Sequence, residues 1–559
     1  VQLTNTGTVP RNVTGIAAVP IYGRSADNLR DHRNVTSMLH RIKTTDHGVL
    51  VKPTMSFDEK GHRENRKIYY VLGSAGTGEK PAAFYPTVEG FLGEGGTFLK
   101  PRAVYEGAEG VPAGRSFAGR EAMGGICFPA VTLEPGQSAE YIILLGVSED
   151  EAEIDRVLSS FHTVEQVRAA LSVTRAHWQE QVNVRYHTGD PNFDRWMRWV
   201  SFQPFLRRIY GCSFLPHHDY GRGGRGWRDL WQDCLSLLLM DPQNVGDMIR
   251  KNFGGVRVDG TNATIIGAGD GNFIADRNGI ARVWMDHALW PLKTTKLYID
   301  QTGDIEILNR QVPYFKDRQI MRGTQFDSLW NEEYGSRQKS SLQTVYMGSI
   351  LEHLIIQQLT AFYEVGEHNV CRLRDADWND ALDMASQRGE SVAFTCAYAD
   401  NQTELAHLIL LLDSFHPDQP IQLLEEIGIL LNADSDLFHN ASQKEELLQE
   451  YTYRCRHNIS GRQTAFSPAF LADNLSRKAA WLTEYVRSRE WIEGTEEEGW
   501  FNSYYDNHGQ AVEGFFPDHV RMMLTGQVFA IMGHVATDTQ IQKITKSADH
   551  YLYDQRSGG

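Results

Sequence analysis

Long hydrophobic runs are missing from this sequence of 559 residues: no stretch approaches the roughly 20 apolar residues that a helix needs to cross a bilayer. Cysteines are few for the length and show neither a CxxC pair nor the ligand spacing of a metal site. They are Cys127, Cys212, Cys234, Cys371, Cys396 and Cys455. We therefore expect no membrane partner, no bound metal and a reduced, cytoplasmic setting.

Positive charge is scarce as well. The 55 lysines and arginines are outnumbered by 71 aspartates and glutamates, which gives a net charge of -16. A nucleic-acid partner calls for a basic face, so we expect none. Because 559 residues exceed the usual size of one hydrophobic core, we predict two or three structural units.

The first 147 residues are rich in strand-like segments. The runs 13–22, 68–72 and 139–147 contain many β-branched and aromatic residues, and Gly- and Pro-rich turns separate them. Glu134-Pro135-Gly136 has the composition of a turn that leads into the last of these strands. We predict an antiparallel β-sandwich over residues 1–147, with a supporting rather than a chemical role.

The rest of the chain has mostly helical spacing. Residues 148–151 resemble a helix start with acidic residues in the first turn, and apolar residues recur at helical intervals after them, which predicts a helical linker over 148–188. Amphipathic helices are predicted again around 405–412, 423–431 and 479–486. Successive helices with long loops suit a barrel of paired helices over 189–559, with catalytic groups in the loops at one mouth.

Two dense motifs indicate sugar chemistry. Residues 374–380 read Arg-Asp-Ala-Asp-Trp-Asn-Asp, which sets carboxylates beside an indole ring. A sugar stacks its C–H face on an aromatic ring while an acid protonates the leaving oxygen. The competing interpretation is a cluster of helix-capping residues, since Asp and Asn are common N-caps.

The second motif, from Gly221 to Asp233, combines glycines with Arg222, Arg225 and Arg228. Glycines let backbone N–H groups approach an anion and arginines supply forked donors, so the segment could hold phosphate. It is no P-loop, because no Lys-Ser/Thr follows the glycines. The alternative is a surface turn that leads into a helix over 235–240.

Two further segments leave alternatives open. His217-His218-Asp219 suggests a metal site, but adjacent histidines on regular structure cannot both face one ion, so we predict none. The segment from Trp284 to Trp290 contains Asp286 and His287. It could line the same mouth, or its tryptophans could be core residues of a helix.

Taken together, five motifs resemble the inverting glycoside phosphorylases of the cellobiose phosphorylase type, including the larger bacterial β-glucan phosphorylases. The similarity extends over essentially the whole chain. The motifs are Arg228-Asp229-x-x-Gln232-Asp233, 286–290, 298–304, 377–380 and 500–506.

The resemblance implies an (α/α)6 barrel preceded by an antiparallel β-sandwich and a helical linker. It implies that Asp380 is the general acid, that Trp378 lies beside the reacting sugar and that Arg228 lies near phosphate. No cofactor is expected, because inorganic phosphate is a co-substrate. The candidate residues are Asp380 for catalysis; Trp378, Asp229, Arg222, Asp233, Asp377, Asp286 and His287 for the sugar; and Arg228 and Arg225 for phosphate.

The reaction implied is reversible inverting phosphorolysis of β-linked gluco-oligosaccharides, with β-1,3 linkages favoured and β-1,2 next. Its products are α-glucose 1-phosphate and a shortened glucan. Family members have more sandwich at the start, and a His and a Thr-Gly pair of the phosphate site follow the segment that resembles 525–530. We therefore expect an incomplete sandwich and barrel, with a missing C-terminal segment or a homodimer mate as partner.

Two other functions stay open. One is an inverting glucoside hydrolase on the same barrel, which would need a second carboxylate such as Glu513 to face Asp380 across a water. The other is a non-catalytic glucan-binding module. Dependence on phosphate separates all three.

Overall fold

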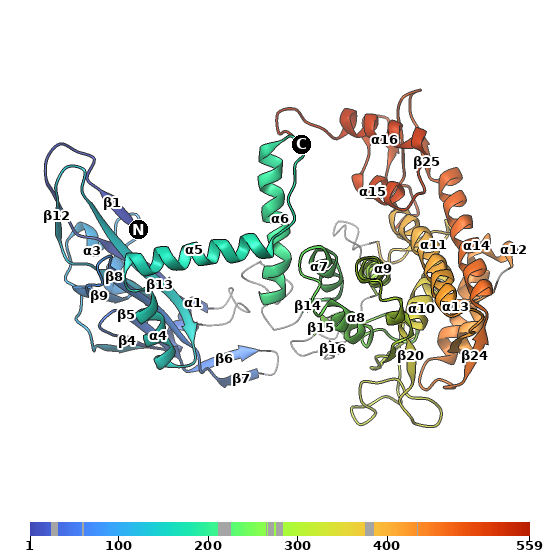
Figure 1. The fold of residues 1–559 in the computed structure, drawn as a ribbon, viewed down its shortest axis with the longest axis horizontal. Helices are drawn as coiled ribbons and strands as arrows, with labels where there is room; N and C mark the ends of the chain where they lie inside the picture. The colour runs from blue at the N-terminus through green and yellow to red at the C-terminus, as the bar shows by residue number, and fades with distance from the viewer. Residues whose placement is uncertain are drawn as a thin grey trace. The chain divides into compact units, whose positions relative to one another are not determined.

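The computed structural model describes residues 1–23, 32–58, 61–210, 225–263, 265–266, 273–274, 283–374, 385–432 and 434–559. Among these, residues 1–185 form one compact unit, and 186–210 together with 225–559 form a second. The first unit is built mainly of strands and the second mainly of helices (Figure 1). This division agrees with the predicted change from β to α structure.

Two antiparallel sheets make up most of the first unit. The larger contains, in spatial order, β1 (Gln2–Thr4), β13 (Ser138–Ser148), β8 (Ile68–Ala75), β5 (Gly48–Pro53), β4 (His40–Thr44) and β10 (Ser116–Ala118). The smaller contains β3 (Ile16–Ile21), β11 (Ala122–Cys127) and β9 (Ala83–Thr87). Two-stranded pairs are formed by β2 (Arg11–Val13) with β12 (Val131–Leu133) and by β6 (Met55–Asp58) with β7 (Gly61–Glu64).

The two sheets share one hydrophobic core. Val49 and Val71 from the larger sheet are buried in the same cluster as Phe84 and Ile126 from the smaller. A Cβ added at Gly124 would lie 2.4 Å from the Cβ of Val71, so this position must be glycine for the sheets to approach. The predicted antiparallel β-sandwich is confirmed.

Two helices follow the last strand of the sandwich. Helix α4 (Glu151–Phe161) begins after Asp150, whose side chain accepts from the N–H of Ala152. Helix α5 (Val164–Gln181) begins at a capping box formed by Thr163 and Gln166. Ile154 of α4 joins a buried cluster with apolar side chains of β5 and β8, which fastens the first helix to the sandwich.

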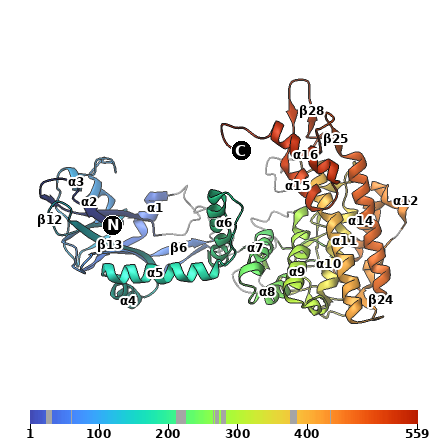
Figure 2. The same cartoon turned by 45° about the horizontal axis from the view of Figure 1, so that its top comes forward.

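The second unit contains a succession of helices, which Figure 2 shows side by side. The longer ones are α6 (Pro191–Tyr210), α7 (Trp227–Met240), α8 (Val245–Phe253), α9 (Trp290–Thr302), α10 (Ile350–Tyr363), α11 (Val392–Phe415), α13 (Ala441–Arg454), α14 (Pro468–Arg489), α15 (Leu524–Met532) and α16 (Asp538–Tyr551). Every residue of α10 is buried, and so is most of α11. These two helices therefore form the centre of the unit.

One predicted helix is wrong. The segment 423–431 starts in strand β23 (Ile421–Leu424), which pairs with β24 (Gln463–Phe466). It continues as a 3-10 turn, η6 (Glu425–Ile429), and ends in a turn. The side chains of Leu423, Ile427 and Leu430 are buried as predicted. A strand end followed by one tight turn produced the same apolar spacing as a helix.

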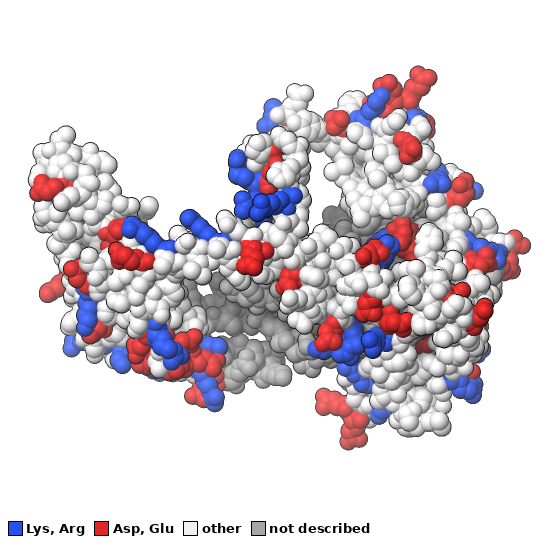
Figure 3. All heavy atoms as spheres, viewed as in Figure 1, with Lys and Arg blue, Asp and Glu red and all other residues white. Residues whose placement is uncertain are grey.

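No described helix is long and apolar enough to span a membrane. Acidic and basic side chains are interspersed over the face drawn in Figure 3. The described cysteines Cys127, Cys234, Cys371, Cys396 and Cys455 are free thiols.

Candidate active site

The start of α7 brings two predicted site residues into position. Strand β14 (Arg225–Gly226) pairs with β15 (Ile265–Ile266), and α7 begins at the next residue. Arg228 and Asp229 therefore stand in the first turn of the helix. A Cβ at Gly226 would lie 2.0 Å from Oδ2 of Asp229, so only glycine lets this carboxylate fold back toward the helix start.

The partner of Arg228 comes from the 3-10 turn η3 (Met285–Ala288). Nε of Arg228 lies 2.9 Å from Oδ2 of Asp286, and its Nη2 donates to Oδ1 over 3.1 Å. The Asp286 side chain has no exposed surface, and Trp290 Nε1 also donates to Oδ2, over 3.2 Å. Burial raises the pKa of Asp286, while the guanidinium and the indole N–H oppose the increase. A forked charge-assisted pair thus joins two segments 58 residues apart.

His287 is held beside this pair as a neutral imidazole. Its Nδ1 accepts from Asn262 Nδ2 over 3.0 Å, and its carbonyl oxygen accepts from Trp227 Nε1 over 3.0 Å. Burial and the nearby charge of Arg228 lower its pKa well below the usual value. The ring lies nearly parallel to that of Trp284, at 5.4 Å and 9°.

Some of the tryptophans near Arg228 belong to the hydrophobic core, and one belongs to the candidate site. Trp227 and Trp231 are completely buried, and Trp290 is 8% exposed. Trp284 is partly exposed, and the Arg228 guanidinium lies 4.5 Å from its ring. The core interpretation therefore holds for Trp290, whereas Trp284 forms a wall with Arg228 and His287.

Other predicted site residues have no described side chain. Arg225 lies in β14 and Asp233 in α7, but nothing is described of their side chains. Arg222, Asp377, Trp378 and Asp380 lie outside the described residues.

The strands on either side of residues 375–384 are described. Strand β21 (Cys371–Arg372) pairs with β22 (Glu390–Ser391), which also pairs with β27 (Tyr504–Tyr505). This small sheet links the two strands that flank residues 375–384 to the segment 500–506, which contains β27. Both flanking strands precede buried α11.

Sequence reasoning missed a network of two arginines around one carboxylate. Glu364 forms ion pairs with Arg322 Nε and, over 3.1 Å, with Arg374 Nη1. Arg374 Nη2 donates to the carbonyl of Arg322 over 2.8 Å, and Arg322 Nη1 donates to that of Asp259 over 2.7 Å. Arg322 also lines a small cavity with Trp284 and His287. No motif contains these residues together, so only the fold shows the network.

Glu513, the carboxylate considered for a hydrolase, has a structural role. It is 4% exposed, and its two oxygens accept from the backbone N–H groups of Ser503 and, over 2.6 Å, Met523. Burial raises its pKa to about 7. Because both oxygens are engaged by backbone donors, Glu513 holds two loops together.

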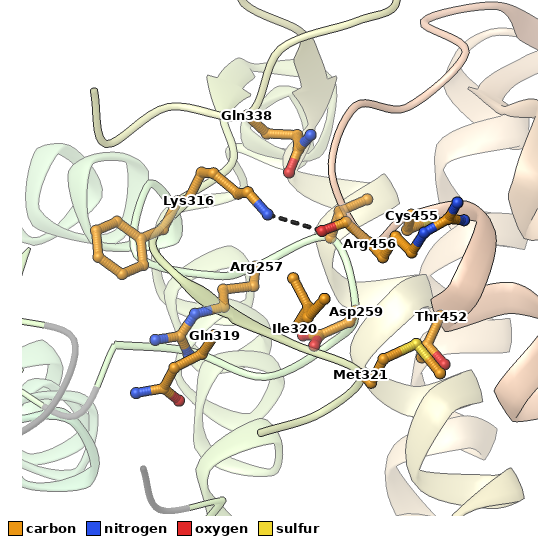
Figure 4. Close-up of a pocket in the computed structure, with 12 residues that line it drawn as sticks. Arg257, Asp259, Lys316, Gln319, Ile320, Met321, Gln338, Thr452, Cys455 and Arg456 are labelled. Carbon is orange, nitrogen blue, oxygen red and sulfur yellow. Dashed lines mark hydrogen bonds between the residues drawn. The ribbon is translucent and has the colours of Figure 1, made fainter. Parts of the chain in front are cut away.

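The cavity drawn in Figure 4 is too small for a sugar. It lies among Arg257, Lys316 and Arg456, where Lys316 Nζ donates to the carbonyl of Arg456 over 2.9 Å. Its volume of about 10 Å³ corresponds to one water molecule. Arg257 is paired with Asp317 through two contacts of 2.8 Å, so its charge is already balanced within the protein.

The geometry thus places an arginine, a carboxylate, an imidazole and an indole on one wall of a helical unit that follows a β-sandwich. Comparison with known proteins defines the class. Residues 1–164 match the glycosyl hydrolase 94 supersandwich domain, and residues 177–408 match the catalytic domain of the glycosyl hydrolase 94 superfamily. The chain belongs to this superfamily.

The similar curated proteins include three phosphorylases. Solabiose phosphorylase of Paenibacillus borealis is 22% identical over 497 residues, which cover 88% of this chain and 50% of that protein. N,N'-diacetylchitobiose phosphorylase of Vibrio proteolyticus is 22% identical over 47% of this chain and 32% of its own length. The 3-O-beta-D-glucopyranosyl-beta-D-glucuronide phosphorylase of Paenibacillus borealis is 24% identical, with coverages of 48% and 30%. The chain spans about half the length, or less, of these relatives.

Among solved structures, a bacterial glucoamylase complexed with acarbose aligns with a TM-score of 0.43 and 9% identity. The alignment covers 92% of this chain and 59% of that one.

Proposed function

We propose that this protein catalyses reversible, inverting phosphorolysis of β-linked gluco-oligosaccharides, which yields α-glucose 1-phosphate and a shortened glucan. The observation that supports it most is the wall formed by Arg228, Asp286, His287 and Trp284 in a chain of the glycosyl hydrolase 94 superfamily. The names of the similar phosphorylases favour phosphate over water as the second reactant.

In the proposed reaction, Asp380 is the general acid. It gives its proton to the bridging oxygen as the bond from that oxygen to the anomeric carbon breaks, and a phosphate oxygen bonds to that carbon from the opposite face. No carboxylate base is needed, because phosphate is already an anion. The Asp380 carboxylate that this transfer leaves takes up a proton from solvent before the next cycle, and the hydrogen phosphate ester that is formed releases its own proton to solvent.

We propose that Arg228 holds phosphate, as the resemblance to the phosphorylases implies. Its pair with Asp286, through Nε and Nη2, fixes the plane of the guanidinium. Trp284 is partly exposed and lies 4.5 Å from the guanidinium, and we propose that its indole borders the bound sugar.

We extend the proposal to architecture and substrate. The helices of the second unit form part of an (α/α)6 barrel whose mouth holds the site, and residues 1–147, 148–188 and 189–559 are sandwich, linker and barrel. A β-1,3-linked glucan is the favoured substrate, and a β-1,2-linked glucan is next. The protein works in the cytoplasm, with phosphate as co-substrate and no metal.

The hydrolase alternative is weakened by Glu513, whose oxygens are both occupied by backbone donors. A water-activating base needs a free oxygen that faces the water. The glucan-binding module remains as the second candidate function.

The decisive experiment is a product assay with β-1,3-linked glucotriose, with and without inorganic phosphate. We expect phosphate-dependent release of the α anomer of glucose 1-phosphate, identified by NMR. Glucose release without phosphate would show a hydrolase, and binding without turnover would show a binding module. The β-1,2-linked trisaccharide, assayed in parallel, tests the linkage.

A further inference from the structure

A polar cavity of about 250 Å³ lies at one end of the helical unit, away from the candidate active site. Four elements meet there: α10 begins, α11 ends, β23 passes and α14 begins. The polar side chains that line it are Asn309, Gln311, Ser349, Asp413, His416, Gln419 and Gln422.

The length of the central helix separates this cavity from the candidate active site. Tyr398 of α11 donates to the carbonyl of Met285 at the candidate active site, whereas Asp413 lies near the C-terminal end of the helix. At 1.5 Å per residue, the helix covers roughly 22 Å between these two residues. Helix α10 also connects the two regions. Its N-cap, Ser349, lines the cavity, and its C-cap, Glu364, belongs to the arginine network. The cavity is therefore a separate site.

The lining has the chemistry of a site for a neutral, hydroxyl-rich ligand. Amide side chains such as those of Gln419 and Gln422 donate and accept hydrogen bonds, as pairs of sugar hydroxyls require. Both glutamines are exposed. The remaining charges disfavour an anion: His416 is paired with Glu306, and Asp413 adds a carboxylate whose buried Oδ1 has no hydrogen-bond donor. A phosphate group would meet no arginine or lysine among the lining residues.

An aromatic pair lies beside the cavity. Ile421, a lining residue, is the strand partner of Phe466, whose ring stacks on that of Phe470 at 6.0 Å and 14°. Pro468, between these two phenylalanines, also lines the cavity, and the Phe470 side chain is 43% exposed. An exposed aromatic face beside hydroxyl-binding amides is the combination that carbohydrate sites use.

We propose that this cavity is a second carbohydrate-binding site, which holds a neutral gluco-oligosaccharide at a distance from the reaction centre. The identity of the sugar rests on the proposed function, whereas the position and polarity of the cavity do not. Such a site retains longer glucans between turnovers by raising their local concentration. Disaccharides bound at the reaction centre gain nothing from it.

Binding without phosphate tests the proposal, because phosphorolysis then cannot occur. A β-1,3-linked glucohexaose is titrated by calorimetry into the wild type and into Gln419→Ala/Gln422→Ala. We expect two binding events in the wild type, and loss of one, or an affinity at least about tenfold weaker for it, in the variant. Gln443→Ala, an exposed glutamine of α13 outside the cavity, is the matched control and should bind as the wild type does.

A blocking variant and a kinetic assay complete the test. Gln422→Trp places an indole at the cavity from an exposed position and should also remove the second event. In phosphorolysis, both variants should raise the KM for the hexaose several-fold and leave kcat and the KM for the disaccharide unchanged. One binding event that neither variant alters would overturn the second site alone. No binding of the hexaose anywhere would overturn the proposed substrate class together with it.

Discussion

Arg228 holds Asp286 through two separate donors, with Nε 2.9 Å from Oδ2 and Nη2 3.1 Å from Oδ1. The carboxylate has no exposed surface, whereas the arginine side chain is 14% exposed. The pair therefore holds a fully buried carboxylate against an arginine that reaches the surface only in part. This arrangement fixes the orientation of the guanidinium.

Arg228→Lys should weaken the binding of phosphate more than the binding of the sugar. Lysine keeps the charge but lacks the planar, forked group that holds Asp286 with two donors and that matches a phosphate group. We expect the KM for phosphate to rise about tenfold, which corresponds to about 1.4 kcal/mol, and the KM for the glucan to change less than threefold. Steady-state titration of each substrate measures both. A selective loss of sugar affinity would make Arg228 a sugar ligand and place the phosphate elsewhere.

Trp284 and Trp290 should respond differently to the same substitution. Trp284→Phe reduces the partly exposed aromatic wall, so glucan affinity should fall by about threefold to tenfold with little change in Tm. Trp290→Phe removes a buried indole N–H donor to Asp286, so unfolding free energy should fall by about 1–3 kcal/mol with smaller effects on affinity. Calorimetric titration and thermal denaturation separate the two. If the two variants changed glucan affinity and stability to the same extent, the assignment of Trp284 to the site and Trp290 to the core would be wrong.

Asp380→Asn should abolish phosphorolysis of natural glucans while glucan binding stays within about tenfold. The amide keeps the shape of the side chain but has no acidic proton to donate. A nitrophenyl glucoside, whose leaving group needs less protonation, should lose much less rate. Comparison of kcat for the two substrates checks the prediction, and near-normal turnover of the natural glucan would exclude Asp380 as the general acid.

Glu352 should make the protein less stable as the pH rises through the acidic range. It lies fully buried in α10 and accepts from the hydroxyls of Tyr314, over 2.7 Å, and Tyr346, over 3.1 Å. Burial raises its pKa from 4.5 to about 7. The folded state therefore binds the proton more strongly, and the stability present below pH 4.5 is lost as the pH approaches 7.

Glu352→Gln removes this titration and keeps the size of the side chain. We expect the variant and the wild type to have similar unfolding free energies at pH 5 and the variant to be more stable by up to about 3 kcal/mol at pH 8. Chemical denaturation at both pH values measures this. Glu445→Gln, at an exposed position on α13, is the control and should change neither value. If Glu352→Gln lowered the unfolding free energy equally at both pH values, the pH dependence would not come from the Glu352 carboxyl.

Much of the local structure could be predicted from the sequence. The strands of the sandwich, the helices α4 and α5 and the helical segments of α11 and α14 follow from spacing, capping and composition within a few neighbouring residues. The prediction failed at β23 and η6, where pairing with β24 decided the conformation. Apolar spacing over nine residues does not distinguish a strand and a turn from two turns of helix.

The sequence by itself determined the sandwich, the mainly helical unit after it, and the motifs by which the chain resembles its superfamily, because each depends on short segments. Only the tertiary structure decided that Arg228 pairs with Asp286, that Trp284 rather than Trp290 faces the site, and that backbone donors occupy both oxygens of Glu513. It also brought Arg322, Glu364 and Arg374 into one network. These contacts join residues that lie far apart in the chain. They depend on how the helices and loops pack and on which side chains become buried, and a local sequence pattern contains neither.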